Sequence, residues 1–392
     1  MEKDPFEEYF READPDRAGK IYAWKTAIGL QAVDGLQPTQ YLIDTAAQNI
    51  EGKISLQKAQ QLIDSYYESK PIRSESDERT EEADKVSARI AGILSETAFS
   101  FTIQEYISIH RKLFCGIYKH AGKIRDYNIT KQEWVLDGAT VMYGTASELK
   151  ATLEYDFSQE KKFNYRGLLM DEMIRHLAHF ISKLWQIHPF GEGNTRTTAV
   201  FFIKYLRSLG FSVENDSFAE HSWYFRNALV RANYTDLQKG IHETTEYLER
   251  FMRNLLLNEK NTLSNRYLHI NRQVSEEKVD IENSKVDIGA MKVDIGASKM
   301  DIENREAAYQ DLNVVFERLI SRQVHTFSAK TMVHIYRLFD KFGFEGIFGR
   351  GMVMDLLGLK ASGASKLLSG MLQAGLIEPV SGHGKGKYRF KC

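Results

Sequence analysis

The sequence predicts a mainly α protein. Apolar residues recur at spacings of three and four between Leu169 and Trp185, which is typical of an amphipathic helix. The stretch from Thr197 to Leu209 is apolar almost all round, which indicates a buried helix. Only six prolines interrupt the 392 residues. These observations predict a helical core in which a short polar loop separates two long helices.

Composition narrows the class of protein. A chain of this length accommodates two or three domains, and a net charge of −1 excludes a global attraction to nucleic acid or membranes. Two cysteines, Cys115 and Cys392, form neither a disulfide framework nor a zinc motif. The chain has no apolar run near 18 residues and no signal-peptide pattern at its charged start. We therefore expect a cytoplasmic protein that does not enter a membrane.

Residues 1–80 are predicted to form a small helical module. Helices are expected from Tyr41 to Ile50 and from Ile54 to Tyr67, separated by a break at Gly52. The charge-dense stretch from Lys70 to Lys85 indicates a linker. The module is either a structural cap or a regulatory element.

Residues 85–260 are predicted to form the central domain. Helices are expected from Val86 and from Ile103 to Tyr118. The pair Asp137-Gly138 lies between two β-prone runs, which predicts a hairpin over 134–143. An exposed hairpin edge of this kind can pair with an extended segment of a partner protein.

Residues 261–325 contain a repeat. Lys-Val-Asp-Ile recurs at Lys278, Lys285 and Lys292, and Lys-Met-Asp-Ile follows at Lys299, with a period of seven. This period favours a helical spacer that would form a homo-oligomer through a coiled-coil seam, with an irregular linker as the alternative.

Residues 326–392 are predicted to form a separate small unit. A helix from Thr331 to Phe342 precedes two short helices, and two strands flank the glycine-rich tip 381–386. This order resembles a winged helix. Its basic residues are few, namely Lys366, Lys385, Lys387 and Arg389. Such a unit would bind either DNA or protein, and the sequence does not decide between them.

The loop between the two long helices carries the chemistry. His188 has a pKa range suited to a general base, and Glu192 is a hard oxygen ligand for Mg²⁺. Gly191 and Gly193 permit close approach of a ligand, and Arg196 can bind a phosphate. The start of the following helix offers free N–H groups to an anion. Each residue alone fits a capped turn, but together they predict a phosphate site.

This loop resembles the motif of the Fic (filamentation induced by cAMP) family, His-x-Phe-x-(Asp/Glu)-Gly-Asn-Gly-Arg-x-x-Arg. The matching residues are His188, Phe190, Glu192, Gly193, Asn194 and Arg196. The resemblance extends over roughly residues 85–260. It implies a Fic-type helical core in which the hairpin is a flap that docks the target protein at Thr140, Val141 and Met142.

The resemblance also implies transfer of AMP from ATP to a Ser, Thr or Tyr hydroxyl of a target protein. His188 would then activate the hydroxyl, and Glu192 would hold Mg²⁺ on the nucleotide. The anion hole would comprise Gly193, Asn194 and Thr195, and Arg196 would bind a phosphate beyond the α-phosphate.

Two departures from the family pattern concern regulation. The final arginine of the motif is replaced by Ala199, and the third glycine by Thr195. The stretch Ser87–Gly92 resembles the family's inhibitory helix but has Ala91 in place of its glutamate. In the family that glutamate pairs with the final arginine. The joint absence favours a variant that dispensed with this switch over an engineered change at Ala91.

The nucleoside pocket is expected on the helix after the core. Tyr224, Asn227 and Arg231 are spaced three and four apart and so share one face. Arg226 or Arg231 could replace the missing arginine. A surface helix with salt bridges fits the same pattern equally well.

Three functions are consistent with the sequence. The first is a protein nucleotidyltransferase of the Fic type. The second is a DNA-binding transcriptional regulator in which a degenerate core senses nucleotide. The third is transfer of another group, such as phosphocholine or phosphate, at the same loop.

Overall fold

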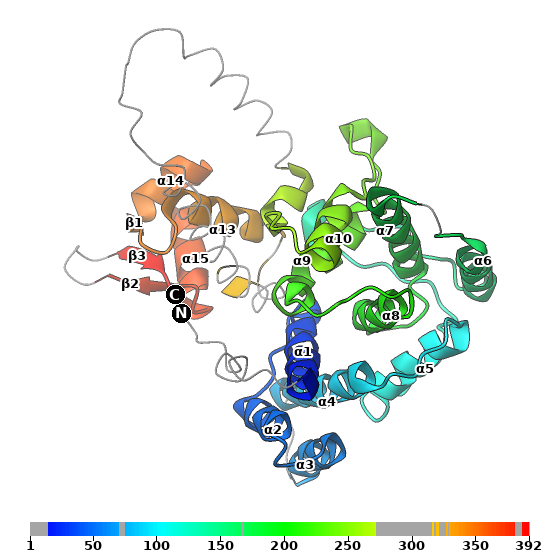
Figure 1. The fold of residues 1–392 in the computed structure, drawn as a ribbon. Coiled ribbons are helices and arrows are strands. Elements are labelled where there is room, and N and C mark those ends of the chain that lie inside the picture. Colours follow the sequence, from blue (N-terminus) through cyan, green and yellow to red (C-terminus); the bar gives the residue numbers. More distant parts are fainter. Residues whose placement is uncertain are drawn as a thin grey trace, which may run out of the picture. The chain divides into compact units, whose positions relative to one another are not determined.

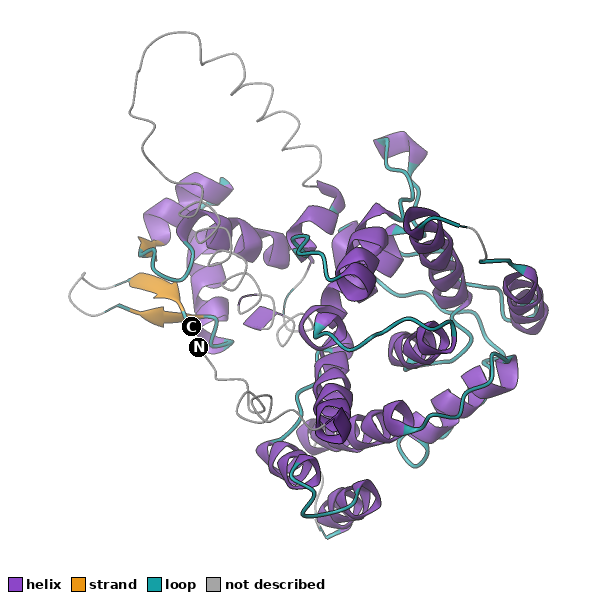
Figure 2. Cartoon of the chain, in the orientation of Figure 1, coloured by secondary structure: helices purple, strands orange, loops and turns teal. Residues whose placement is uncertain are grey.

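The computed structural model is mainly helical, as predicted (Figure 2). It describes residues 15–69, 75–165, 168–271, 316, 319–320, 327, 329–380 and 386–391. The chain divides into two compact units: the larger holds the described residues of Glu2–Lys131 and Thr140–Leu263, and the smaller those of Gln132–Ala139 and Ser264–Cys392. Within the described ranges, no helix is both long and apolar enough to cross a membrane.

The larger unit consists of helices and loops, with no strand among its described residues. Its helices in chain order are α1 (Pro15–Gly29), the 3₁₀ helix η2 (Leu30–Asp34), α2 (Gln40–Ile50), α3 (Leu56–Glu68), α4 (Glu75–Ser95), α5 (Ile103–Phe114), α6 (Leu149–Lys162), α7 (Met170–Ile187), α8 (Asn194–Ser208), α9 (Ser217–Arg231), the 3₁₀ helix η4 (Leu237–Lys239) and α10 (Glu246–Leu257). Helix α8 packs against α4, α5, α7 and η2 (Figure 1). Every residue from Asn194 to Leu206 is buried, so α8 is the central helix that the sequence predicts.

The N-terminal helices begin where side chains cap them. The Thr39 hydroxyl accepts a hydrogen bond from the Leu42 N–H, and the Ser55 hydroxyl accepts one from the Lys58 N–H. The predicted helices after these caps are confirmed as α2 and α3. Helices α1 and α4 pack together, and α1 also packs on α9.

The linker predicted from Lys70 to Lys85 is wrong for most of its length, because α4 already begins at Glu75. Three of its acidic residues, Glu81, Glu82 and Asp84, are held by partners in the folded chain. Asp84 is fully buried and accepts hydrogen bonds from the Thr39 N–H (2.8 Å), the Thr39 hydroxyl (2.6 Å) and the Tyr67 hydroxyl (2.7 Å). The charged residues that indicated an exposed linker therefore include side chains that make contacts between helices.

The smaller unit contains all the strands that the structure describes. Its elements are the 3₁₀ helices η3 (Trp134–Leu136) and η5 (Asn265–Leu268), α13 (Ala329–Phe342), β1 (Phe348–Gly349), α14 (Arg350–Leu357), α15 (Ala361–Gln373), β2 (Ile377–Pro379) and β3 (Lys387–Phe390). The strand order is β1-β3-β2, and both pairings are antiparallel. Register places Phe348 opposite Tyr388 and Ile377 opposite Phe390.

The hairpin predicted over 134–143 does not form paired strands. Trp134, Val135 and Leu136 make the single turn of η3, and Asp137 follows with a φ of 54°. All three η3 side chains are buried, and the Trp134 ring stacks on that of Tyr336 at 5.0 Å. Three consecutive inward side chains do not fit the alternation of a strand with one exposed face, which explains the turn.

The C-terminal helices and strands lie close to their predicted positions. β1 was not predicted, and the tip residues 381–385 lie outside the described residues. The winged-helix interpretation and its DNA or protein partner stay predictions. One of the four basic residues, Arg389, forms an ion pair with Glu378 at 2.7 Å. The heptad repeat of 278–302, and with it the predicted oligomer, also lies outside the described residues.

Candidate active site

The loop between α7 and α8 has a backbone that depends on its glycines. Gly193 has a φ of 74°, and a Cβ at this position would lie 2.3 Å from Cε2 of Phe114. A Cβ on Gly191 would lie 2.6 Å from the Tyr127 hydroxyl oxygen. No larger residue fits at Gly193 without displacing the Phe114 ring. Gly193 is therefore required for the path of the loop, whereas a side chain at Gly191 would have to displace the end of the exposed Tyr127 side chain.

Arg125 fixes the first half of the loop. This side chain is buried, and its Nε donates to the carbonyl oxygen of His188 at 2.8 Å. Its guanidinium also donates to the carbonyls of Tyr127 and Gly144, and its backbone N–H donates to Pro189 O at 2.9 Å. His188 has a φ of 49°, a conformation that costs free energy and persists only where the surroundings impose it. Arg125 supplies that constraint, so we assign it as a positioning residue.

The His188 ring is set up to accept a proton. It is buried, and its Nδ1 lies 3.2 Å from the carbonyl oxygen of Trp185. A carbonyl can only accept, so Nδ1 carries the ring proton and Nε2 is the basic nitrogen. Burial lowers the pKa of His188 well below its usual value, and the positive charge of Lys131 lowers the pKa further. The ring is therefore neutral at physiological pH, as a general base must be.

The start of α8 offers backbone donors. Thr197 is the first residue whose N–H bonds within the helix, to Gly193 O at 3.0 Å, so the N–H groups of the three residues before it have no helical acceptor. The Asn194 side chain turns back to the loop, where it bonds to both the N–H and the carbonyl of Phe190. The Thr195 hydroxyl accepts from Nε1 of Trp185 at 3.0 Å. These two side chains hold the loop, and the groups left for an anion are the backbone N–H groups.

His110 supports the loop from α5. Its ring stacks on Phe190 with centroids 3.7 Å apart. Its Nδ1 accepts from the Gly122 N–H at 2.8 Å, so Nε2 carries the proton and donates to the carbonyl oxygen of Glu192 at 3.0 Å. Burial lowers the pKa of His110 to about 4. The ring is thus a neutral structural support under the loop.

Glu192 presents the exposed face of the loop. Its side chain is 56% exposed and pairs with Lys131, with Nζ and Oε2 3.0 Å apart. In the part of the chain that the structure describes, no three His, Cys, Asp or Glu side chains gather as metal ligands. A single accessible carboxylate fits Mg²⁺, which commonly takes one or two carboxylates and completes its shell with water and substrate phosphates. It does not fit a structural zinc site.

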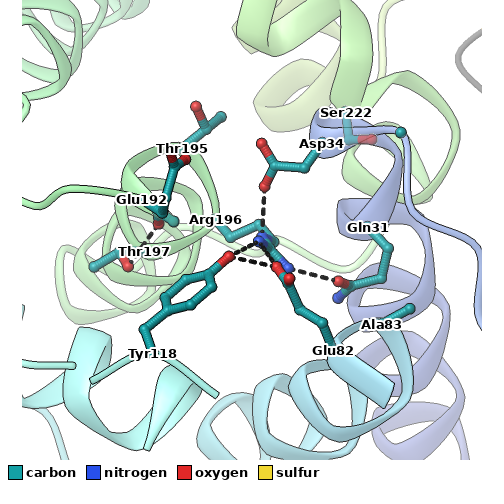
Figure 3. A network of polar contacts seen from close by, with 12 residues as sticks. Gln31, Asp34, Glu82, Ala83, Tyr118, Glu192, Thr195, Arg196, Thr197 and Ser222 are labelled. Atoms are coloured by element: carbon teal, nitrogen blue, oxygen red, sulfur yellow. Dashed lines mark hydrogen bonds and ion pairs between the residues drawn. The ribbon is translucent and has the colours of Figure 1, made fainter. Parts of the chain in front are cut away.

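Arg196 lies on the opposite, buried side of the loop (Figure 3). Its side chain is 1% exposed, with Nε 2.8 Å from Oδ2 of Asp34 and Nη2 paired with Glu82. Nη1 donates to Gln31 Oε1 at 3.0 Å, and the Tyr118 hydroxyl lies 3.4 Å from Nη2. Burial alone would lower the pKa of Arg196, but the charges of Asp34 and Glu82 raise it above its ordinary value. The guanidinium thus faces carboxylates of η2 and α4.

The positions of the two missing charges are filled by packing. Ala91 on α4 and Ala199 on α8 are both fully buried, and these two helices pack against each other. The ion pair between α4 and α8 is formed instead by Glu82 and Arg196, each nearer the N-terminus of its helix.

The residues expected to contact a nucleoside are inside the protein. Tyr224, Asn227 and Arg231 are each no more than 1% exposed, so the alternative of a surface helix with salt bridges is wrong. Burial raises the pKa of Tyr224 and lowers the pKa of Arg231. Their role towards a nucleotide stays a prediction.

The segment Thr140–Gly144 runs beside His188. The Gly144 N–H donates to Gln186 O at 3.3 Å, and Gln186 Nε2 donates to Met142 O at 3.1 Å. The Tyr143 and His188 ring centroids are 4.3 Å apart. Thr140 is partly buried, Val141 is buried, and Met142 is 85% exposed. The expected docking segment therefore lies alongside the C-terminal end of α7 and does not pair with another strand that the structure describes.

Sequence reasoning missed four residues of this site: His110, Arg125, Lys131 and Glu82. Arg125 and Lys131 lie on either side of the Asp126–Thr130 stretch. Single basic residues at these positions belong to no periodic pattern that would assign them to the site. Glu82 lies in the stretch that was predicted to be a linker. None of the four could be placed at the loop without the tertiary contacts.

Comparisons with known proteins identify the domain around this loop. Residues 100–206 match the Fic/DOC family. Over 172 residues the chain is 27% identical to the protein adenylyltransferase VbhT of Bartonella schoenbuchensis, and the match covers 38% of this chain and 35% of that protein. The chain thus spans about a third of the length of this curated relative. A solved Fic family protein from Desulfovibrio desulfuricans G20 aligns over 98% of this chain and 90% of its own, with 12% identity and a TM-score of 0.41.

Proposed function

From a chain that carries a Fic/DOC domain at residues 100–206, we propose a protein nucleotidyltransferase that moves AMP from ATP to a Ser, Thr or Tyr hydroxyl of a target protein. The observation that carries the proposal is the state of His188: a buried, neutral ring whose Nδ1 is held by Trp185 O and whose Nε2 is basic. The name of the relative, a protein adenylyltransferase, supports the choice of AMP.

His188 acts as the general base. The target hydroxyl oxygen forms a bond to the α-phosphorus of ATP, and the bond from that phosphorus to the β-phosphate bridging oxygen breaks. The hydroxyl proton passes to Nε2 of His188, and pyrophosphate leaves with the electron pair of the broken bond. Arg125 keeps the ring in place through its bond to the His188 carbonyl.

The rest of the loop binds the phosphates. Glu192 would hold Mg²⁺, which supplies positive charge to the nucleotide phosphates when bound. The N–H groups of Asn194, Thr195 and Arg196 at the start of α8 stabilise the charge that develops on the α-phosphate. Gly191 and Gly193 keep side chains away from this face.

Nucleoside and target bind on either side of the loop in this proposal. The resemblance assigns the nucleoside side to Tyr224, Asn227 and Arg231, and contact with a nucleoside requires that these side chains, each at most 1% exposed, become accessible. The segment Thr140–Met142 would dock the target backbone beside His188, with the exposed Met142 side chain in the contact. Backbone docking would present many different hydroxyls to one base.

Incubation of a cell lysate with ATP labelled at the α-phosphate, and separately at the γ-phosphate, tests the function. We expect protein labelling from α-labelled ATP only, at least a thousandfold lower in a His188→Ala variant, because proton acceptance and charge stabilisation act together. Labelling from γ-labelled ATP would instead indicate phosphate transfer. Labelling that does not depend on His188 would exclude this loop as the catalytic site.

A further inference from the structure

On the buried side of the loop, no positively charged side chain that the structure describes is available to bind a phosphate. Ala199 carries no charge, and Arg196 is 1% exposed and enclosed by Asp34, Glu82 and Gln31 (Figure 3). A nucleoside triphosphate carries several negative charges, and backbone N–H groups alone leave most of them without a counter-charge. Besides the proposed Mg²⁺, a positively charged side chain is therefore needed on the accessible side of the loop.

Lys131 is placed there. Its Nζ lies 3.0 Å from Oε2 of Glu192, and its side chain is 30% exposed. Among the residues that the structure describes, Glu192 is the only group with which Lys131 pairs. Its charge also reaches His188, because it is the strongest of the three cations that lower the pKa of that ring. Lys131 thus contacts the carboxylate proposed to hold the metal, and its charge acts on the proposed base.

The other two cations near His188 are less suited to this role. Arg125 is buried and donates to four carbonyl oxygens of the loop and its neighbours, so it cannot turn to a ligand without releasing the loop. Arg226 lies over the Trp223 ring, 5.2 Å from its centroid. Arg231 is buried and is not among the charges that act on His188.

We propose that Lys131 is a phosphate-binding residue of this site, which pairs with Glu192 until nucleotide enters and then turns its ammonium group to the triphosphate. The exchange requires little free energy, because a solvent-exposed ion pair contributes little to stability. A lysine suits it, since its ammonium is a point charge on a flexible stem. This inference rests on the proposed function, in which Glu192 turns to Mg²⁺ and the triphosphate enters beside it.

Calorimetric titration tests the proposal with variants built on His188→Ala, so that no nucleotide is consumed. ATP, inorganic tripolyphosphate and adenosine are each titrated with and without Mg²⁺ into His188→Ala alone and combined with Lys131→Met, Lys131→Arg or Lys123→Met. Lys123 is an exposed lysine of the same segment and serves as the matched control. We expect Lys131→Met to weaken ATP and tripolyphosphate about tenfold or more and to leave adenosine within twofold, because one charge-assisted contact is lost. Lys131→Arg should retain most of the affinity, and Lys123→Met all of it.

Two results overturn the proposal in different ways. If His188→Ala binds ATP and the added Lys131→Met leaves that affinity unchanged, Lys131 is not a phosphate ligand while the proposed function stands. A loss on Arg226→Met instead would assign the role to Arg226. If neither ATP nor tripolyphosphate binds at all, the proposed function fails together with the inference.

A readout without nucleotide tests the position of Lys131 directly. NMR titration of the His188 ring in the nucleotide-free protein should give a higher pKa in Lys131→Met than in the parent, and an unchanged pKa in Lys123→Met. An unchanged pKa in Lys131→Met would place Lys131 too far from the base for the proposed role.

Discussion

The ion pairs at the start of α8 and in the loop before it differ in exposure. Arg196 is 1% exposed, and its partners Asp34 and Glu82 are 36% and 16% exposed, whereas Lys131 and Glu192 are 30% and 56% exposed. Breaking a buried pair leaves an uncompensated charge in a medium of low dielectric constant, while breaking an exposed pair returns both charges to water. The Arg196 ion pairs are therefore a permanent contact between helices, whereas the Lys131–Glu192 pair can break so that each side chain binds a ligand.

The Arg196 ion pairs make the N-terminal helices part of the site. Asp34 ends η2 and Glu82 lies on α4, so both segments are fastened to the first turn of α8. The N-terminal helices contribute side chains directly to the loop, and they belong to the same compact unit as the rest of the site. A chain shortened to the residues that match the family, 100–206, would lack both carboxylates that pair with Arg196.

The buried pair should give the largest loss of stability. We expect Glu82→Gln to lower the free energy of unfolding by about 3 kcal/mol, because a buried guanidinium loses a charged partner. Chemical denaturation of this variant, with Glu78→Gln on the exposed face of the same helix as control, measures the loss. A loss below about 1 kcal/mol would mean that the Arg196 pair is no firmer than a surface pair.

The pH dependence of stability tests the support under the loop. The pKa of His110 is about 4 in the folded protein and near 6.5 when unfolded, so the unfolded chain binds the extra proton first. This difference contributes stability that is present above pH 6.5 and is lost as the pH falls towards 4, about 3 kcal/mol in all. Denaturation at a series of pH values should show a smaller loss in His110→Gln. An equal loss in that variant would show that His110 is not the group that titrates.

The Arg125 contacts should affect rate more than substrate binding. We expect Arg125→Lys to lower kcat about a hundredfold and leave KM for ATP within about threefold, since a small displacement of the base slows proton transfer. Steady-state kinetics, with Arg175→Lys on the exposed face of α7 as control, checks this. If KM rises and kcat is unchanged, Arg125 supports nucleotide binding and does not position His188.

The exposed pair should have the smallest effect on stability. Lys131→Met should change the free energy of unfolding by less than about 1 kcal/mol, and the change should shrink further at high salt. Chemical denaturation at two salt concentrations measures it. A change as large as that of Glu82→Gln would remove the distinction between a fixed and an exchangeable pair.

The helical frame of the site follows from the sequence, because periodicity is a local property. The two helices that flank the loop were predicted at 169–185 and 197–209 and are Met170–Ile187 and Asn194–Ser208. The loop residues between them were recognised as one cluster because they are also close together in the sequence. The spacing of three and four also put Tyr224, Asn227 and Arg231 on one face, although it did not reveal that the face is buried.

The contacts that hold the loop do not follow from the sequence. Arg125 and Lys131 lie some sixty residues before the groups they contact, and no local pattern relates them. Arg196 was assigned to a phosphate from the family motif, and that assignment stays a prediction. Its contacts with Asp34 and Glu82 were not foreseen, because Glu82 lay in the stretch interpreted as a linker. Charge density alone does not distinguish a solvated stretch from a helix whose acids are paired inside the protein.

The central claim is that the protein transfers AMP from ATP to a protein hydroxyl, with His188 as the general base. Mass spectrometry of a cell lysate after reaction with ATP and Mg²⁺ tests it most directly, since it gives both the added mass and the modified side chain. The account predicts the mass of one adenylyl group on Ser, Thr or Tyr, present with the unchanged protein and absent with His188→Ala. An added mass of a different group, or adenylylation that persists in His188→Ala, would contradict it.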